Sequence, residues 1–300
     1  MCIRDRAAVS SSGSLIFMLI GFLSGISAGA GVIVARFFGA GDEKNLQRAV
    51  HTTVAFGLVA GVLMTGVGVA LSPQILRWMD TPESVMRESV TYLQIYFAGS
   101  LGFVMYNVLV GILQAVGDSR HPLYYLIVSS VINLVLDLLF ITGFHTGVGG
   151  AAVATVISQI VSALLCFWQL LRTKESYGLK IRKIRFDKGI LVQIIKIGLP
   201  SGVQNSIIAF ANVIVQSNIN AFGEMAMAGY GAYTKVEGFG FLPINSFTMA
   251  LTTFVGQNLG AKQEERTRKG ARFGILAAVI LAELIGVVVF LLAPQLIAAF

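Results

Sequence analysis

Eight long apolar stretches dominate this 300-residue sequence and limit what it can fold into. Each has about 18 residues or more, the length that a helix needs to cross the hydrocarbon core of a membrane. Only 12% of the residues are charged, against about 25% in a typical soluble domain. The alternating ten-residue pattern of membrane β-barrel strands is missing. We therefore predict an all-α integral membrane protein with spans at about residues 14–35, 49–71, 90–116, 122–142, 148–171, 190–219, 227–259 and 271–300.

The basic residues follow the order of these spans. Seventeen Lys and Arg residues lie in the first, third, fifth and seventh connections, whereas the even connections hold only Arg77 and Arg87. This asymmetry is the positive-inside pattern, in which short cytoplasmic connections collect basic residues. We therefore expect the odd connections to be cytoplasmic. The net charge of +7 then reflects membrane topology and not nucleic-acid binding.

An internal repeat links the two ends of the sequence. "VARFFGAGDEKNLQRA" from Val34 is similar to "VGQNLGAKQEERTRKG" from Val255, and "LSPQIL" from Leu71 is similar to "LAPQLI" from Leu292. Both pairs share one offset of 221 residues. Six spans separate the copies, an even number, so both copies run in the same direction across the membrane. We therefore predict a parallel repeat of two six-helix bundles. About eight of the twelve helices lie in this sequence, with one expected before residue 14 and about three after Phe300.

Five segments occur in order along the sequence: "VGDSRHP", "INLVLDLLFI", "GVGGAAVATVISQ", "IKIGLPSGVQ" and "MALTTFVGQNLGA". Together they resemble the multidrug and toxic compound extrusion (MATE) transporters, in their bacterial, DinF-like branch. The resemblance covers nearly everything from Ser14 to Phe300. It implies a monomeric, multi-pass secondary transporter of the bacterial inner membrane, in contact with lipid. Such a transporter exports amphipathic, often cationic, drug-like compounds in exchange for Na⁺ or H⁺ and needs no other cofactor.

The resemblance also divides the chain. Residues 1–13, which begin "MCIRDR", are expected to be a non-native or disordered leader. Residues 14–171 correspond to family helices 2–6 of the first bundle, and residues 190–300 to helices 7–9 of the second. Between them, the basic linker 172–189 carries "IRKIRF", whose amphipathic pattern predicts a helix lying on the cytoplasmic membrane face.

A carboxylate inside an apolar span is the strongest single indication of function. Asn133 and Asp137 are four residues apart and so share one face of a helix. An aspartate near the middle of such a helix costs about 2.5–3.5 kcal/mol, whereas a hydrogen bond between membrane helices returns about 0.6 kcal/mol. A purely structural bond for Asp137 remains the alternative to a functional role. Carboxylate, amide and hydroxyl oxygens suit Na⁺, and a carboxylate can equally carry H⁺.

The family resemblance extends this pair to a cation-coupling cluster. Matched by helix and spacing, its members are Tyr92, Asn107, Asn133, Asp137 and Thr155, with Na⁺ expected at Asp137, Asn133 and Thr155. The family cluster also uses an aspartate on its first helix, which this sequence does not contain.

Weaker candidates for the substrate cavity lie in the second bundle. Lys235 and Glu237 are two residues apart and so do not face each other. The alternative to a role in the cavity is that Lys235 extends to the membrane surface while Glu237 pairs with another helix. Glu283 could be functional or could bind a partner elsewhere in the protein. The remaining candidates, for which bonding between helices is an equal alternative, are Gln204, Asn212 and Gln216.

Two other functions fit the sequence less well. A flippase of the same superfamily, moving lipid-linked oligosaccharide, would line its cavity with several basic residues, and here only Lys235 is a candidate. A membrane-embedded lipid enzyme would need a clustered nucleophile, base or metal set, and none is visible. The sequence also lacks a Walker A motif, so ATP is not expected to drive it directly. We therefore predict a transporter and not an enzyme.

Overall fold

The computed structural model describes residues 21–22, 24–78, 81, 83–144 and 146–298, and the predicted leader lies outside them. Within these ranges all regular structure is helical. Six helices are long and apolar enough to cross a membrane, and one bent pair makes a seventh. A shorter apolar helix, Ser24–Gly39, precedes them. The prediction of an all-α membrane protein is confirmed.

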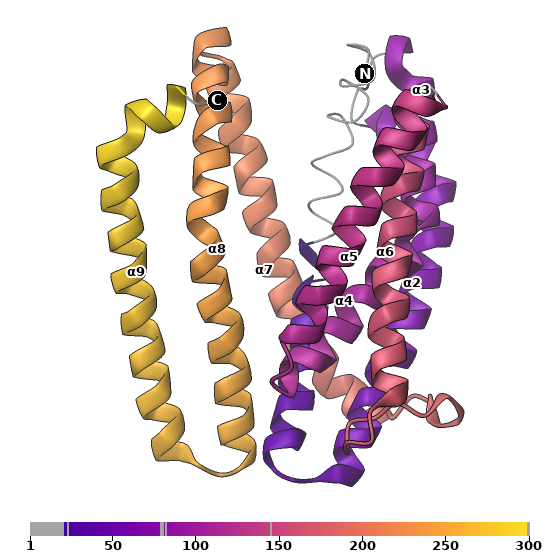
Figure 1. Ribbon diagram of the computed structural model, residues 1–300, viewed down its shortest axis with the longest axis vertical. Coiled ribbons are helices and arrows are strands. Elements are labelled where there is room, and N and C mark those ends of the chain that lie inside the picture. Colours follow the sequence, from indigo (N-terminus) through magenta and orange to yellow (C-terminus); the bar gives the residue numbers. More distant parts are fainter. Residues whose placement is uncertain (1–20, 23, 79–80, 82, 145, 299–300) are drawn as a thin grey trace.

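The spans after Ser24–Gly39 alternate in direction along one long axis, with the bent pair of helices counted as one span (Figure 1). Figure 1 places α8 and α9 on one side, α2 to α6 on the other, and α7 between them. The bounds are α2 Glu43–Trp78, α3 Glu83–Ala98, α4 Ser100–Ala115, α5 Arg120–Leu138, the π-helical turn η1 Leu139–Gly143, α6 Gly147–Arg172, the 3₁₀ turn η2 Ile181–Lys183, α7 Lys188–Asn220, α8 Glu224–Gly260 and α9 Glu264–Ala298.

The third predicted span, 90–116, is broken in the structure. α3 and α4 meet at Gly99 and are bent by 44°. A Cβ atom at Gly99 would lie 2.3 Å from Cγ2 of Val156, so α6 packs directly against the break. The sequence predicted one span because the apolar run continues through this glycine.

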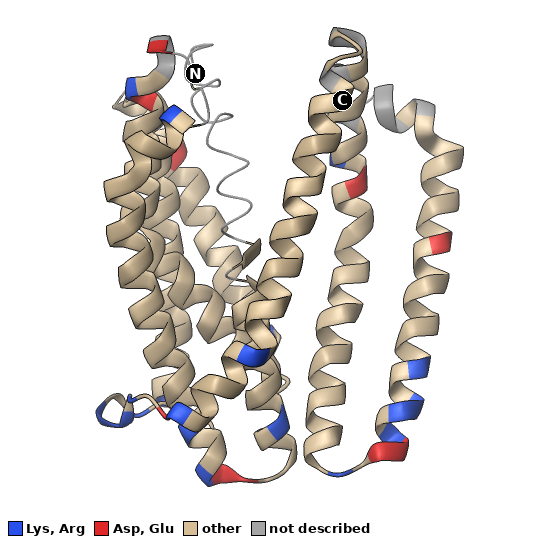
Figure 2. Ribbon diagram, turned by 180° about the vertical axis from the view of Figure 1, so that it is seen from behind, with Lys and Arg blue, Asp and Glu red and all other residues tan. Residues whose placement is uncertain are grey.

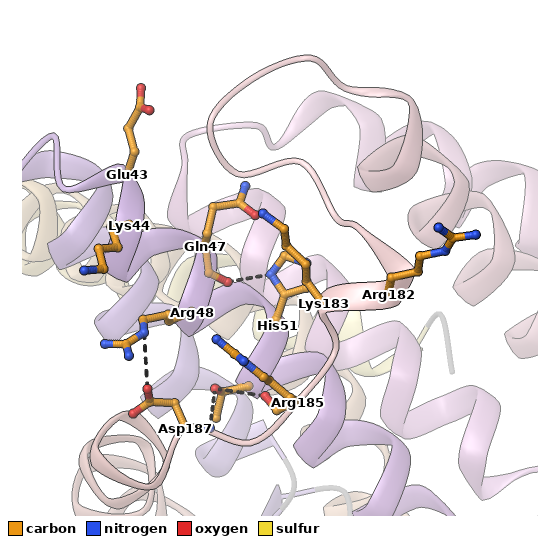
Figure 3. Close-up of a pocket in the computed structure, with 10 residues that line it drawn as sticks. Glu43, Lys44, Gln47, Arg48, His51, Arg182, Lys183, Arg185 and Asp187 are labelled. Atoms are coloured by element: carbon orange, nitrogen blue, oxygen red, sulfur yellow. Dashed lines mark hydrogen bonds and ion pairs between the residues drawn. The ribbon is translucent and has the colours of Figure 1, made fainter.

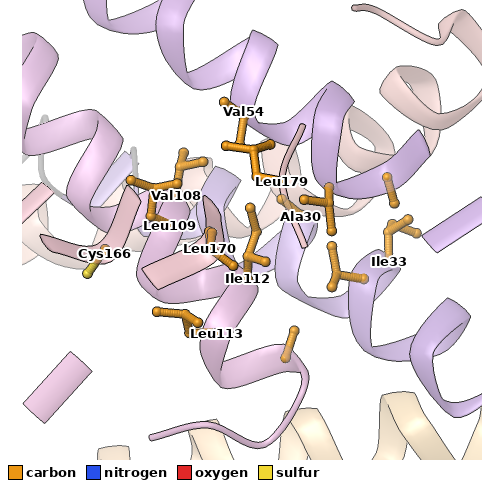
Figure 4. Packing of buried hydrophobic residues seen from close by; sticks show 14 of the residues in the cluster. Ala30, Ile33, Val54, Val108, Leu109, Ile112, Leu113, Cys166, Leu170 and Leu179 are labelled. Atoms are coloured by element: carbon orange, nitrogen blue, oxygen red, sulfur yellow. The ribbon is translucent and has the colours of Figure 1, made fainter. Parts of the chain in front are cut away.

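The first bundle has a large buried apolar core (Figure 4) and a smaller second cluster between α2 and α3. The side chains of the large core come from the first described helix, α2, α4 and α6, the linker adds Leu179, and the start of α7 adds Ile190 and Ile194. Cys166 is fully buried within it, which agrees with a packing role for this thiol. By contrast, the apolar segments of α8 and α9 expose most of their side chains. Representative core residues are Ala30, Ile33, Val54, Val108, Leu109, Ile112 and Leu170.

The linker between the bundles is not the surface helix that the sequence predicted. Only Ile181–Lys183 forms a single 3₁₀ turn between α6 and α7. The rest is held by side chains of α2: the amide of Lys180 donates to Nε2 of His51 at 3.0 Å, and the amide of Asp187 donates to Oγ1 of Thr52 at 3.1 Å. Because α2 supplies these partners, the linker backbone does not need helical hydrogen bonds.

The predicted repeat is visible in two turns. The helix ending at Gly39 is followed by Gly41 with φ 65°, and α8 is followed by Lys262 with φ 58°. Both residues lie in the left-handed region, where a non-glycine residue is uncommon. Three backbone hydrogen bonds of the first turn recur 221 residues later. In the first turn, the amides of Ala40, Gly41 and Asp42 donate to the carbonyl oxygens of Arg36, Phe38 and Phe37, respectively. In the second, the amides of Ala261, Lys262 and Gln263 donate to those of Gln257, Leu259 and Asn258.

The same two turns meet each other between the bundles. A Cβ atom at Gly39 would lie 1.9 Å from the carbonyl oxygen of Gln257, and one at Gly260 would lie 1.9 Å from that of Arg36. Gly39 and Gly260 are equivalent positions of the repeat, and so are Arg36 and Gln257. The two contacts are therefore equivalent, as expected for two copies related by a two-fold axis. We call this contact the glycine seam.

Charged residues mark the two ends of the molecule (Figure 2). Most Lys and Arg gather at the end that holds the connections 40–42, 173–187 and 261–263, which we call the basic end. Arg77 and Arg87 lie at the opposite end. This distribution agrees with the alternation read from the sequence.

Candidate functional site

Asn133 and Asp137 lie in α5, and each has a side-chain polar atom without a hydrogen-bond partner among the described residues. Both side chains are partly buried. Nδ2 of Asn133 and Oδ1 of Asp137 are shielded from solvent, and neither forms a hydrogen bond within the described residues. An unsatisfied buried polar atom costs about 1–3 kcal/mol, so such atoms need an explanation. The π-helical turn η1 begins two residues after Asp137, and such turns are frequent at functional sites.

Two more predicted members of the cation cluster have neighbours of their own. Tyr92 stacks on Tyr96, with ring centroids 6.4 Å apart. Thr155 is partly buried on α6, and its hydroxyl donates to the carbonyl oxygen of Ala151 at 3.0 Å. A hydroxyl that donates in this way keeps lone pairs free to accept a hydrogen bond or to bind a cation.

Asn107, the remaining predicted member of the cation cluster, lines a cavity that the other four members do not line. Its amide donates to the carbonyl oxygen of Phe103 at 2.9 Å, and the side chain lines a cavity of about 500 Å³ between the bundles. Asn133, Asp137, Thr155 and Tyr92 do not line that cavity. The structure therefore places Asn107 in the cavity between the bundles, apart from the other four predicted residues.

This cavity is lined by uncharged polar groups from both bundles. The first described helix contributes Ser24 and Ser27, α4 contributes Gln114 beside Asn107, and α7 contributes Asn205. Asn245, Thr248 and Thr252 follow one another at i, i+3 and i+7 on one face of α8. These residues were not predicted from the sequence, although their helical spacing is visible in it. The other lining residues are Ala28, Gly31, Val110, Gly111, Ala115, Met249 and Thr253.

Contacts between the bundles hold the walls of the cavity together. Nε2 of Gln257 donates to the carbonyl oxygen of Ala115 at 2.8 Å, and Oγ1 of Thr253 donates to that of Gln114 at 3.3 Å. On α7, Nδ2 of Asn205 donates to the carbonyl oxygen of Gly21 at 3.1 Å. These bonds link α8 to α4 and α7 to the first described helix.

The other predicted cavity residues lie outside the lining. Gln204, Asn212, Lys235 and Glu283 are exposed, and Gln216 is partly buried. Glu237, also partly buried, accepts a hydrogen bond from the hydroxyl of Tyr233 at 2.9 Å. On α7 it is Asn205, next to Gln204, that reaches the cavity.

The residues between Gly25 and Gly29 match the G-x-S-x-G pattern of hydrolase nucleophiles, which the sequence analysis overlooked. Here the pattern lies inside a helix and not at a strand-to-helix turn. A Cβ at Gly25 would lie 2.2 Å from the amide nitrogen of Gly202, and one at Gly29 would lie 2.4 Å from that of Gly198. The glycines therefore serve close packing against α7. Among the described residues, no three His, Cys, Asp or Glu side chains gather into a metal site.

Comparison with known proteins agrees with this architecture. The MatE family profile matches residues 5–139 and 200–300. A probable multidrug resistance protein of Bacillus subtilis, YoeA, is 32% identical over 98% of the chain and 65% of its own length. A probable multidrug resistance protein of Thermotoga maritima, NorM, is 26% identical over 99% of the chain and 65% of its own length.

Solved structures give the same result. An outward-facing MATE transporter of the MOP superfamily aligns with TM-score 0.91 and 25% identity over 99% of this chain and 66% of that one. A MOP superfamily transporter of Pyrococcus furiosus, whose binding pocket of reverse polarity suggests a different function, aligns with TM-score 0.90 and 26% identity over 98% and 66%. The chain thus spans just under two thirds of the length of these relatives. On its sequence, its fold and the repeat within it, the chain belongs to the MATE family of transporters.

Proposed function

We propose that the protein is a secondary active exporter of amphipathic, cationic organic compounds, which it exchanges for Na⁺ or H⁺ by alternating access between its two bundles. The observation that carries the proposal is the cavity of about 500 Å³ between the bundles, lined from both sides by amide and hydroxyl groups. Its size fits a drug-sized ligand. Relatives that cover nearly the whole chain are named multidrug resistance proteins.

The lining suits an amphipathic cation. The amide oxygens of Asn107, Asn205 and Asn245 can accept hydrogen bonds from an ammonium group, while Val110 and Met249 offer apolar contact. No Lys or Arg lines the cavity in the described part of the chain. A flippase for an anionic lipid-linked oligosaccharide is therefore the weaker alternative, because it would need basic residues there.

Ion coupling is assigned to the pair on α5. Asp137 and Asn133 each hold a buried polar atom without a partner among the described residues, and a bound Na⁺ or a proton on the carboxylate would satisfy the oxygen. Thr155 on α6, which packs against α5, and Tyr92 on α3, which packs against α6, would supply hydroxyl oxygens. Binding of the ion would then favour one arrangement of the bundles, which is how a coupling ion drives export.

The test is Asp137→Asn in the full-length protein, expressed in a bacterial host that lacks its own exporters. We expect efflux of ethidium to fall to the level of the empty vector at unchanged membrane expression, because Asn cannot carry a proton or charge-balance Na⁺. The control is Glu83→Gln, which removes an exposed carboxylate at the start of α3. Normal efflux by Asp137→Asn would contradict the coupling role, whereas no efflux by the unmodified protein would contradict export itself.

The coupling ion is identified in proteoliposomes that hold the purified full-length protein. A Na⁺ gradient and a pH gradient are imposed separately, and dye transport is followed. Transport driven by only one of them names the ion, and Asp137→Asn should abolish that response. A response to neither gradient would contradict antiport.

A further inference from the structure

A strongly basic pocket, drawn in Figure 3, is lined by residues of the basic end and shares no lining residue with the cavity between the bundles. It has a volume of about 700 Å³ and lies between the start of α2 and the linker. Five basic side chains and two carboxylates line it. Its lining residues are Glu43, Lys44, Gln47, Arg48, His51, Thr52, Arg182, Lys183, Arg185 and Asp187.

One carboxylate of the pocket is already engaged. Oδ1 of Asp187 accepts the amide of Ile190 at 3.1 Å at the start of α7, and its Oδ2 lies 3.4 Å from Nε of Arg48. No ion pair joins Lys44, Lys183 or Arg185 to a carboxylate within the described ranges. The pocket therefore keeps an excess of positive charge that an anion could neutralise.

The backbone that carries these basic residues is fixed. His51 is 3% exposed; its Nδ1 lies 2.6 Å from the carbonyl oxygen of Gln47, and its Nε2 accepts the amide of Lys180. Thr52 is fully buried and bonds both the carbonyl of Arg185 and the amide of Asp187. Lys183 and Arg185 extend from this anchored segment toward the side chains of α2 in Figure 3. Because the site is preorganised, binding an anion would order little additional backbone.

One candidate span ends at Arg172 and the next begins at Lys188, on either side of the linker, so we place the pocket near the membrane surface. Ile181 and Phe186 flank its basic residues and are 61% and 47% exposed. Near the end of α6, the guanidinium of Arg172 lies 4.6 Å from the ring centroid of Trp168, and Trp is enriched where a helix leaves the hydrocarbon core. Apolar side chains beside a cationic pocket at this level match an anionic lipid, whose acyl chains and phosphate lie next to each other.

We propose that this pocket binds a phosphate group, supplied by the headgroup of an anionic phospholipid or by free inorganic phosphate. Lys183 and Arg185 of the linker and Lys44 and Arg48 of α2 hold the phosphate between them. The exposed Ile181 and Phe186 favour the lipid as its source. The site does not depend on the exported compound or on the coupling ion, so it stands or falls separately from export.

The test uses the full-length protein in neutral detergent, titrated with phosphatidylglycerol, phosphatidylcholine or inorganic phosphate and followed by native mass spectrometry. We expect preferential binding of phosphatidylglycerol, and binding weaker by about tenfold or more in the double variant Lys183→Gln, Arg185→Gln, because each basic residue near an anionic headgroup contributes measurably to binding. The control Arg268→Gln, Arg272→Gln removes two exposed charges from α9 at the same end and should bind normally.

A charge-preserving exchange, Lys183→Arg with Arg185→Lys, should keep the binding and so separates loss of charge from loss of fold. Inorganic phosphate that binds at millimolar concentration, and is lost in the Gln variant, would support the phosphate site and name the soluble source. Equal loss in the α9 control, or unchanged binding in the Gln variant, would overturn the proposal.

Discussion

Asp137 in α5 is the functional candidate that the sequence indicates most strongly. The insertion cost of Asp137 in an apolar helix demands an explanation. The structure adds that Oδ1 of Asp137 and Nδ2 of Asn133 have no hydrogen-bond partner in the part of the chain that it describes. Asn107 was placed by family resemblance with this pair, yet it lines the cavity between the bundles. Helix number and depth are readable from sequence, but the direction of a side chain around the helix depends on packing between bundles.

At the same scale, the cavity residues of α8 can be tested directly. Asn245→Leu and Thr252→Leu should each reduce dye efflux by about threefold to tenfold, because each removes a hydrogen-bonding group from the lining. Gln204→Leu is the matched control, since this exposed residue of α7 lies outside the lining. Concentration-dependent efflux rates in whole cells measure the effect. An equal loss in the control would indicate general damage to the bundle.

At the scale of elements, the linker shows why a sequence pattern can mislead. The amphipathic "IRKIRF" predicts a helix, but the hydrogen bonds that decide its shape come from His51 and Thr52, about 130 residues earlier. Long-range partners of this kind leave no periodic signal. The apolar helices, in contrast, were predictable because each depends mainly on its own composition.

The start of α7 provides a test at this scale. Asp187 caps the helix and pairs with Arg48, so Asp187→Ala should lower the free energy of unfolding by about 1 kcal/mol through the lost cap. Asp187→Asn keeps a capping oxygen and removes only the partly exposed ion pair, so it should cost less. Thermal unfolding of the full-length protein in detergent compares the two. If Asn were as destabilising as Ala, the ion pair and not the cap would stabilise this junction.

At the scale of the whole molecule, the glycine seam sets how closely the bundles approach at the basic end. Gly39→Ala would place a Cβ atom against the carbonyl oxygen of Gln257, which cannot move without its backbone. We expect the two ends to separate and the conformational equilibrium to shift toward opening there. Spin labels at Glu43→Cys and Glu264→Cys, exposed residues related by the repeat, would report a longer distance by electron resonance.

Gly66→Ala is the matched control for this shift. Gly66 also lies within a membrane helix, but a Cβ atom there would meet nothing within 4 Å. Its label distance should equal that of the unsubstituted protein. A distance unchanged by Gly39→Ala would mean that the seam does not hold the bundles together.

The seam also bears on how such a chain could arise. In the seam, each copy of the repeat uses equivalent residues to contact the other copy, as two identical subunits do around a two-fold axis. In a homodimer, any substitution at this interface would appear twice, once in each subunit. Once the halves are joined in one gene, each side can vary alone: Gly41 keeps its glycine, while the equivalent turn carries Lys262 in nearly the same backbone conformation. Covalent fusion thus frees a symmetric interface to become asymmetric, one residue at a time.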